Sequence, residues 1–191
     1  PAFTLFVVGL SDFAQKWWFV IFATIMAIGY AFKTARLRSP KFADTVDKVM
    51  LKIPAVGAIL ENAVVARYAR TLATTFAAGV PLVEALGSVA GASGNAVYRD
   101  AILQVQADVT TGLTIHTALR AADLFPVMLL QLTSIGEESG SLDEMMEKAA
   151  DHYEEAVDNA VDNLTALLEP MIMAVLGVLV GGLLIAMSLP F

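Results

Sequence analysis

Glu169 and Pro170 lie where an acidic segment meets an uncharged one, and both have chemical consequences there. Residues 171–191 carry no formal charge. An ionisable group inside a bilayer is costly and usually marks an ion or proton pathway, whereas at the headgroup level it is solvated. Pro170 has no amide proton, so the carbonyl of Ala166 loses its helical partner and a bend becomes possible. The pair therefore predicts a hinge at the membrane surface or, alternatively, an ion-binding group within the bilayer.

The remaining reactive residue types form no recognisable catalytic or metal-binding pattern. His116 and His152 are the only histidines, neither has an ExxH partner, and cysteine is absent. No GxxxxGK[ST], HExxH or GxSxG sequence occurs. The segment from Asp158 to Asn163 lacks the glycine and ligand spacing of a calcium loop. We therefore expect no catalytic residue, cofactor or metal, and no nucleic-acid partner.

Carboxylates gather near the end of the chain, on a segment with helical periodicity. Between Glu137 and Glu169 there are eleven carboxylates and one lysine, Lys148. Apolar residues from Met145 to Leu168 form a stripe on one side of this segment, which predicts an amphipathic helix with an acidic opposite face. That face is either a solvated surface or a docking surface for a basic partner. The candidate contact residues are Glu137, Glu138, Glu147, Asp151, Glu154, Glu155, Asp158 and Asp162.

Two uncharged apolar runs indicate a membrane protein. The mean hydropathy is +0.68, and 57% of residues are hydrophobic, yet no charge lies in Trp17–Phe32 or Met171–Phe191. A bilayer core needs roughly 20 helical residues, so the second run is long enough, and the first suffices if its flanking lysines extend to the interface. A buried core helix is the alternative for the first run. Trp17, Trp18 and Tyr30 near its ends favour a membrane helix.

Basic residues predict the orientation. The run after the first span contains Lys33, Arg36, Arg38, Lys41, Lys48 and Lys52, which places it in the cytoplasm by the positive-inside rule. The expected segments are an extracytoplasmic stretch 1–16, a span 17–32, a cytoplasmic linker helix 33–54, a cytoplasmic helical bundle 55–165 and a span 167–191. The chain begins with proline, so we interpret it as part of a longer protein.

The middle segment predicts six helices joined by short connections. The expected ranges are about 58–78, 81–91, 95–111, 114–122, 126–140 and 142–168, with Gly79, Pro81 and Gly140 at interhelical corners. Ser141 and Glu144 fit a capping box. No run alternates like a strand, so the fold class is all-α: an antiparallel six-helix bundle flanked by two membrane helices. Gly177 and Gly181 permit close packing, either against the first span or against a second copy.

Three stretches resemble one protein family. They are ARTLATTFAAGVPLVEALGSVAG (residues 69–91), FPVMLLQLTSIGEESGSLDEMMEKAADHYEEAVDNAVDNL (125–164) and EPMIMAVLGVLVGGLLIAMSLP (169–190). They are similar to the C-terminal half of the PilC/GspF inner-membrane platform proteins of type IV pilus assembly and type II secretion. The resemblance covers essentially the whole chain and favours the pilus branch.

The resemblance implies a scaffold in the bacterial inner membrane, not an enzyme. Its expected partners are a hexameric cytoplasmic assembly ATPase, pilin or pseudopilin subunits, inner-membrane alignment-complex proteins and a second copy in a dimer. An ion-coupled transport subunit that uses Glu169 is the alternative function. Cation flux in liposomes that disappears in Glu169→Gln would favour that alternative.

Overall fold

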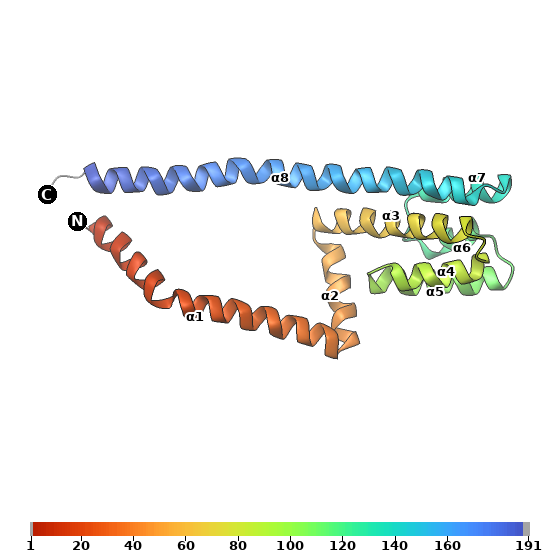
Figure 1. Ribbon diagram of the computed structural model, residues 1–191, viewed down its shortest axis with the longest axis horizontal. Coiled ribbons are helices and arrows are strands. Elements are labelled where there is room, and N and C mark those ends of the chain that lie inside the picture. Colours follow the sequence, from red (N-terminus) through yellow and green to blue (C-terminus); the bar gives the residue numbers. More distant parts are fainter. Residues whose placement is uncertain (1, 189–191) are drawn as a thin grey trace. The chain divides into compact units, whose positions relative to one another are not determined.

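The computed structural model describes residues 2–188, except for the side chains of residues 2–7, 10–15 and 186. This part of the chain forms eight helices and no strand, so the all-α prediction is confirmed. Figure 1 labels the helices in chain order. The helices belong to two compact units. One comprises residues 1–40 and 163–191, and the other, which we call the bundle, comprises Lys41–Asp162.

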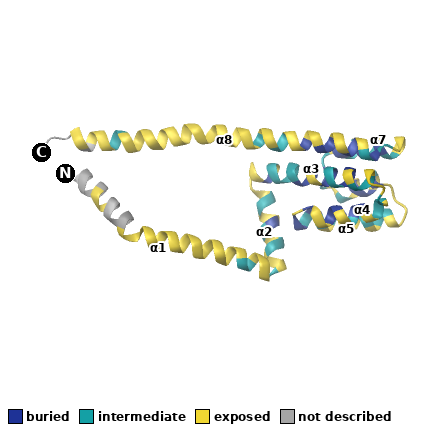
Figure 2. Cartoon of the chain, viewed as in Figure 1, coloured by how far each residue is buried: buried dark blue, intermediate teal, exposed yellow. Residues whose placement is uncertain are grey.

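The first unit contains the two candidate membrane spans. Helix α1 runs from Ala2 to Arg38 and includes an apolar stretch from Lys16 to Arg38, and the later part of α8 (Leu142–Ser188) supplies the second. The predicted span 17–32 thus lies inside a longer helix. The large apolar side chains of both stretches are exposed, as the yellow ribbon in Figure 2 shows. Surfaces of this extent and apolarity suit lipid rather than water.

A third candidate span does not fit the packing. Helices α2 (Pro40–Lys52) and α3 (Val56–Ala77) are together long and apolar enough to cross a membrane, but they are bent by 112° at their junction. Helix α3 buries Tyr68 and Leu72 completely inside the bundle. We therefore assign both helices to the bundle. The predicted linker helix 33–54 is divided between α1 and α2, because a residue before proline, here Ser39, disfavours the helical conformation.

Local capping chemistry explains most of the helix boundaries. Gly79 has φ of +81° after α3, and Pro81 precedes α4 (Leu82–Ala92). Asn95 accepts hydrogen bonds through Oδ1 from the amides of Val97 and Tyr98, which starts α5 (Ala96–Thr110). These boundaries agree with the predicted ones, because each depends on residues adjacent to the helix end.

The next helices begin and end in the same way. The hydroxyl of Thr114 accepts a hydrogen bond from the amide of Thr117 at 3.2 Å and starts α6 (Ile115–Ala122). Pro126 precedes α7 (Val127–Ser139), and Gly140, with φ of +72°, follows it. The left-handed conformation at Gly140 is costly for residues with a Cβ atom, so glycine suits this corner.

The predicted capping box at the start of α8 is not formed. The amide of Ser141 donates to the carbonyl of Gly136 at 3.0 Å, and the Ser141 hydroxyl lies 2.6 Å from the hydroxyl of Ser139. The carboxylate of Glu144 instead pairs with Lys148 at 3.1 Å. The preceding turn of α7 thus supplies the acceptor for the amide that Glu144 was expected to satisfy.

The bundle packs around one apolar core, which appears dark blue in Figure 2. Helix α4 packs against α3 and α5, and α6 packs against α5 and α7. Phe125 contacts two tyrosine rings, with centroid distances of 5.4 Å to Tyr68 and 5.7 Å to Tyr98. The largest fully buried side chains are Tyr68, Leu72, Leu86, Ile102, Ile115, Leu119, Leu129 and Met146.

The two core tyrosines predict opposite effects of removing a hydroxyl. The Tyr68 hydroxyl is buried and has no hydrogen-bond partner among the described residues, and burial raises its pKa, so it stays protonated. Tyr68→Phe is expected to raise the free energy of unfolding by about 1 kcal/mol, because the orphaned polar group is removed. Tyr98→Phe should lower it by about 0.5–1 kcal/mol, because its hydroxyl donates to the Leu124 carbonyl at 3.3 Å. Thermal unfolding of the full chain in detergent would test this, and an equal loss in both variants would contradict it.

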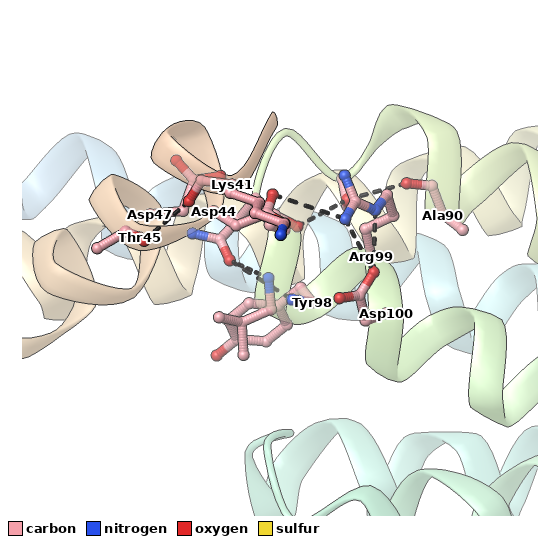
Figure 3. A network of polar contacts seen from close by, with 12 residues as sticks. Lys41, Asp44, Thr45, Asp47, Ala90, Tyr98, Arg99 and Asp100 are labelled. Atoms are coloured by element: carbon pink, nitrogen blue, oxygen red, sulfur yellow. Dashed lines mark hydrogen bonds and ion pairs between the residues drawn. The ribbon is translucent and has the colours of Figure 1, made fainter. Parts of the chain in front are cut away.

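Helix α2 is fastened to the start of α5 by carboxylates (Figure 3). Asp47 is 8% exposed, and its Oδ2 accepts a hydrogen bond from the amide of Ala96 at 3.0 Å. Asp44 lies 3.8 Å from the guanidinium of Arg99. The negative charge of Asp47 is well placed there, because a helix N-terminus carries partial positive charge and unsatisfied amides.

Candidate functional site

The candidate surface is the acidic side of α8 within the bundle. The opposite side of the same helix packs into the core through Met146, Ala149, Ala150 and Tyr153. This apolar side fixes which residues face outward, because neighbours on a helix face recur at three or four positions. Six predicted contact residues lie exposed on the outward side: Glu147, Asp151, Glu154, Glu155, Asp158 and Asp162.

Arg70 of α3 binds two of these six carboxylates. Its Nε and Nη2 donate to the two oxygens of Glu154, both at 2.9 Å, and Nη2 also donates to Asp151 at 2.6 Å. A bidentate guanidinium–carboxylate contact is among the stronger charge-assisted pairs. Hydrogen bonding and the positive charge of Arg70 hold the pKa of Glu154 below its ordinary value, although partial burial opposes the shift. Asp151 and Glu154 are therefore already paired with a residue of the bundle.

The remaining four carboxylates keep the surface acidic. No ion pair to Glu147, Glu155, Asp158 or Asp162 is found within the described part of the chain. We call these four residues the open acidic patch. Their charges add without neutralisation, so the patch attracts cationic surfaces and repels anionic ones at a range of about 8 Å in physiological salt.

A shallow groove runs beside the Arg70 contact, between α3 and α8. Ala63, Ala66 and Thr71 form its α3 wall together with Arg67 and Arg70, and the α8 wall contains Glu154, Val157 and Asp158. Arg67 is held in place by donating to the carbonyl of Ser93 at 3.3 Å. The groove thus presents small residues flanked by fixed charges of both signs, which suits a protein surface better than a small reactive substrate.

The Arg70 contact predicts an acid-dependent contribution to stability. The folded-state pKa of Glu154 is lowered, so this contribution is present above the ordinary carboxyl pKa and is lost as pH falls through the folded-state value. Both partners are exposed, so the contribution is expected to be small. In Arg70→Gln the melting temperature should fall less steeply below about pH 4.5 than in the unchanged chain. Identical acid profiles for the two proteins would contradict this assignment.

Glu137 and Glu138, predicted together as contact residues, have different environments. Oε1 and Oε2 of Glu137 accept hydrogen bonds from the amides of Ile115 at 2.6 Å and His116 at 2.9 Å, so this carboxylate caps α6. Glu138 is exposed and accepts a hydrogen bond from the Ser134 hydroxyl at 3.1 Å. The geometry supports a structural role for Glu137 and leaves Glu138 accessible.

Close packing at the α7–α8 corner depends on Gly136, which sequence reasoning did not single out. Gly136 is buried, and a Cβ atom added there would lie 2.9 Å from Cα of Leu142. By contrast, the predicted corner residues Gly79 and Gly140 have open space around them and are explained by their positive φ angles. The IGEESG sequence already contained Gly136, but nothing in its spacing indicated that another backbone would approach it.

The predicted membrane hinge lies on an uninterrupted helix. Glu169 and Pro170 are exposed within α8, which continues as helix through both residues. Gly177 is exposed and Gly181 partly exposed, and a Cβ atom at either would meet nothing within 4 Å. The glycines therefore remain available for helix packing, and the hinge and packing roles of these residues stay predictions.

Comparison with known proteins identifies the family. The family model "Type II secretion system (T2SS), protein F" matches residues 68–190. The chain is 59% identical over its whole length to the type IV pilus assembly protein PilC of Pseudomonas aeruginosa, covering 51% of that protein. It is 53% identical to TapC of Aeromonas hydrophila and 30% identical to a type II secretion system protein F of P. aeruginosa, again over its whole length, covering 46% and 47% of them.

The chain belongs to the type II secretion system protein F family and is similar to PilC-type pilus assembly proteins, so the predicted resemblance is confirmed. It spans about half the length of the curated relatives that it matches. PilC and TapC, both pilus assembly proteins, share more of its residues than the type II secretion system protein F does.

Proposed function

We propose that this chain is the C-terminal half of a platform protein in a bacterial inner membrane, serving type IV pilus assembly or type II secretion. The family match and the names of the relatives support this role. Two apolar helices of spanning length support membrane residence. The basic residues from Lys33 to Lys52 support a cytoplasmic bundle, because cytoplasmic segments next to spans are enriched in lysine and arginine.

The platform acts as a scaffold that couples a hexameric cytoplasmic assembly ATPase to the polymerisation of pilin or pseudopilin subunits. The observation that carries this proposal is that the open acidic patch and an apolar span lie on one helix, α8. A displacement imposed on a continuous helix by a partner at one end reaches its other end through the backbone hydrogen bonds. In this role the chain transmits movement and needs no reacting group of its own.

The membrane part of α8 contains the features expected of a transmission element. Pro170 leaves the Ala166 carbonyl without its usual amide donor, so the helix bends most easily there. Gly177 and Gly181 allow another membrane helix to approach closely, which suits contact with a second copy or a pilin subunit. Alignment-complex proteins of the inner membrane are the remaining proposed partners.

Charge reversal in the open acidic patch tests the coupling. Glu155→Lys is expected to weaken association with the assembly ATPase by about tenfold, because a favourable charge at the interface becomes a repulsive one. Glu84→Lys, at an exposed position on α4, is the matched control and should leave binding unchanged. Binding is measured with the full chain in lipid nanodiscs at low and physiological salt. An equal effect of both variants, or none from Glu155→Lys, would contradict docking at this patch.

A further inference from the structure

The outward side of α2 combines cations with large apolar side chains and carries no carboxylate. Its charged and apolar members are Lys41, Phe42, Lys48, Val49 and Lys52, and with Ile53 in the bend directly after the helix we call them the α2 outer face. Val49 is 53% exposed and Ile53 is 44% exposed. Val49 lies in the last turn of α2 and Ile53 in the bend directly after it, so two exposed apolar side chains stand close together in the sequence beside Lys48 and Lys52.

The charges of α2 are sorted between its two sides. Both carboxylates face α5, where Asp47 caps the Ala96 amide and Asp44 lies near Arg99 (Figure 3). The three lysines are all exposed. Asp47 is buried and Asp44 lies near Arg99, so the three exposed lysines give the outer face a net positive potential.

Connectivity limits where α2 can start. Helix α1, which contains the first apolar stretch, ends at Arg38, and α2 begins at Pro40. Two peptide units extend at most about 7 Å, so the first turn of α2 starts within that distance of the end of α1. A helix with an apolar strip flanked by lysines is the pattern that binds in the plane of a membrane interface.

Other exposed apolar residues of the bundle lack this pattern. Val127 and Ile135 on α7 are 68% and 51% exposed, but α7 contains no lysine or arginine. The charges of α7 would not attract an anionic bilayer, and the exposed carboxylate of Glu138 would repel it. Charge complementarity therefore distinguishes α2 from α7.

We propose that the α2 outer face lies on an anionic lipid surface. Val49 and Ile53 enter the boundary between headgroups and acyl chains, and Lys41, Lys48 and Lys52 contact lipid phosphates. The contact fixes α2 at the interface, and Asp47 carries that attachment to the start of α5. This proposal goes beyond ATPase coupling and holds whichever leaflet faces the bundle.

Fluorescent labelling of single cysteines tests the contact directly, because the natural sequence contains no cysteine. Val49→Cys carries an environment-sensitive nitrobenzoxadiazole label, and Val127→Cys on exposed α7 is the control. The full chain is reconstituted in phosphatidylcholine vesicles with and without phosphatidylglycerol. We expect the label at position 49 to be quenched by nitroxide-bearing lipids and protected from iodide when phosphatidylglycerol is present. The label at position 127 should stay accessible to iodide.

Removing lysines tests the electrostatic part. Each lysine near an anionic surface strengthens association by about fivefold, so Lys48→Gln with Lys52→Gln should weaken it by more than tenfold and restore iodide access at position 49. Lys148→Gln on α8 is the control and should change nothing. The proposal is overturned if position 49 is as accessible to iodide as position 127. Protection from iodide without nitroxide quenching would also overturn it, because it would mean that protein covers the face. Protection that depends neither on phosphatidylglycerol nor on the lysines would overturn it as well.

Discussion

Replacing Glu137 with alanine is expected to lower the free energy of unfolding of the bundle by about 2–3 kcal/mol. The carboxylate accepts hydrogen bonds from the amides of Ile115 at 2.6 Å and His116 at 2.9 Å. Its removal leaves two amides at the start of α6 without their acceptor, and it also removes a negative charge from a helix N-terminus. Helix α6 has only eight residues, so it forms few internal helical hydrogen bonds that could offset the loss.

Glu138→Ala is the matched control for Glu137→Ala. Glu138 is adjacent and carries the same charge, but it is exposed and accepts a hydrogen bond from the Ser134 hydroxyl on its own helix. Its replacement should change stability by less than about 0.5 kcal/mol. Thermal unfolding of the full chain in detergent, with hydrogen exchange at α6, measures both variants. Equal effects, or unchanged exchange in α6 after Glu137→Ala, would show that this carboxylate is not a structural cap.

Gly136→Ala is expected to lower the free energy of unfolding by about 1–3 kcal/mol, which is the usual cost of overpacking. The added methyl group would lie 2.9 Å from the backbone Cα of Leu142 and 3.3 Å from Cβ of Met145. A backbone atom cannot move aside as a flexible side chain does, so the corner between α7 and α8 must open. The start of α8 then shifts in the core that contains Met146.

The same substitution at Gly91 should raise the free energy of unfolding instead of lowering it. Gly91 lies within α4, is exposed and has no atom within 4 Å of an added Cβ. Alanine there should stabilise the helix by about 0.5–1 kcal/mol, because it lowers the backbone entropy lost on folding. Urea unfolding of both variants provides the comparison. A destabilised Gly91→Ala together with an unaffected Gly136→Ala would refute the packing assignment.

The sequence predicts those parts of the fold that depend on neighbouring residues. Asn95 and Thr114 cap helices through amides two or three positions away, and Gly79 and Gly140 end helices through their own φ angles. The composition of the charge-free run that begins at Met171 is enough to predict a membrane-spanning helix. Each of these features is readable without knowing which helices pack together.

The long-range interactions that position the candidate surface and join the helices of the bundle could not be predicted. Arg70 reaches Glu154 across 84 residues, Asp47 reaches Ala96 across 49, and Glu137 reaches Ile115 across 22. From the sequence, Lys148 is the only cation expected to neutralise the acidic helix. No residue close to α8 in the sequence indicates that α3 places an arginine against it. Helix-to-helix register determines these contacts, and periodicity specifies a face rather than a partner.

Ser141 shows how one local motif overrides another. The sequence Ser-Leu-Asp-Glu satisfies the capping-box pattern, but its first amide donates to the Gly136 carbonyl. The acceptor lies only five residues earlier, and this hydrogen bond is the one that closes a helix whose following residue is left-handed, as Gly140 is. The helix end at Gly140 therefore supplies the acceptor that the capping box would have supplied.

Thiol labelling of a single cysteine most directly tests the central claim that the bundle faces the cytoplasm between two membrane helices. Glu84→Cys places the only thiol of the chain on exposed α4. A membrane-impermeant maleimide is applied to intact spheroplasts and to inside-out vesicles. We predict labelling only in the inside-out vesicles, and labelling of intact spheroplasts would contradict the account.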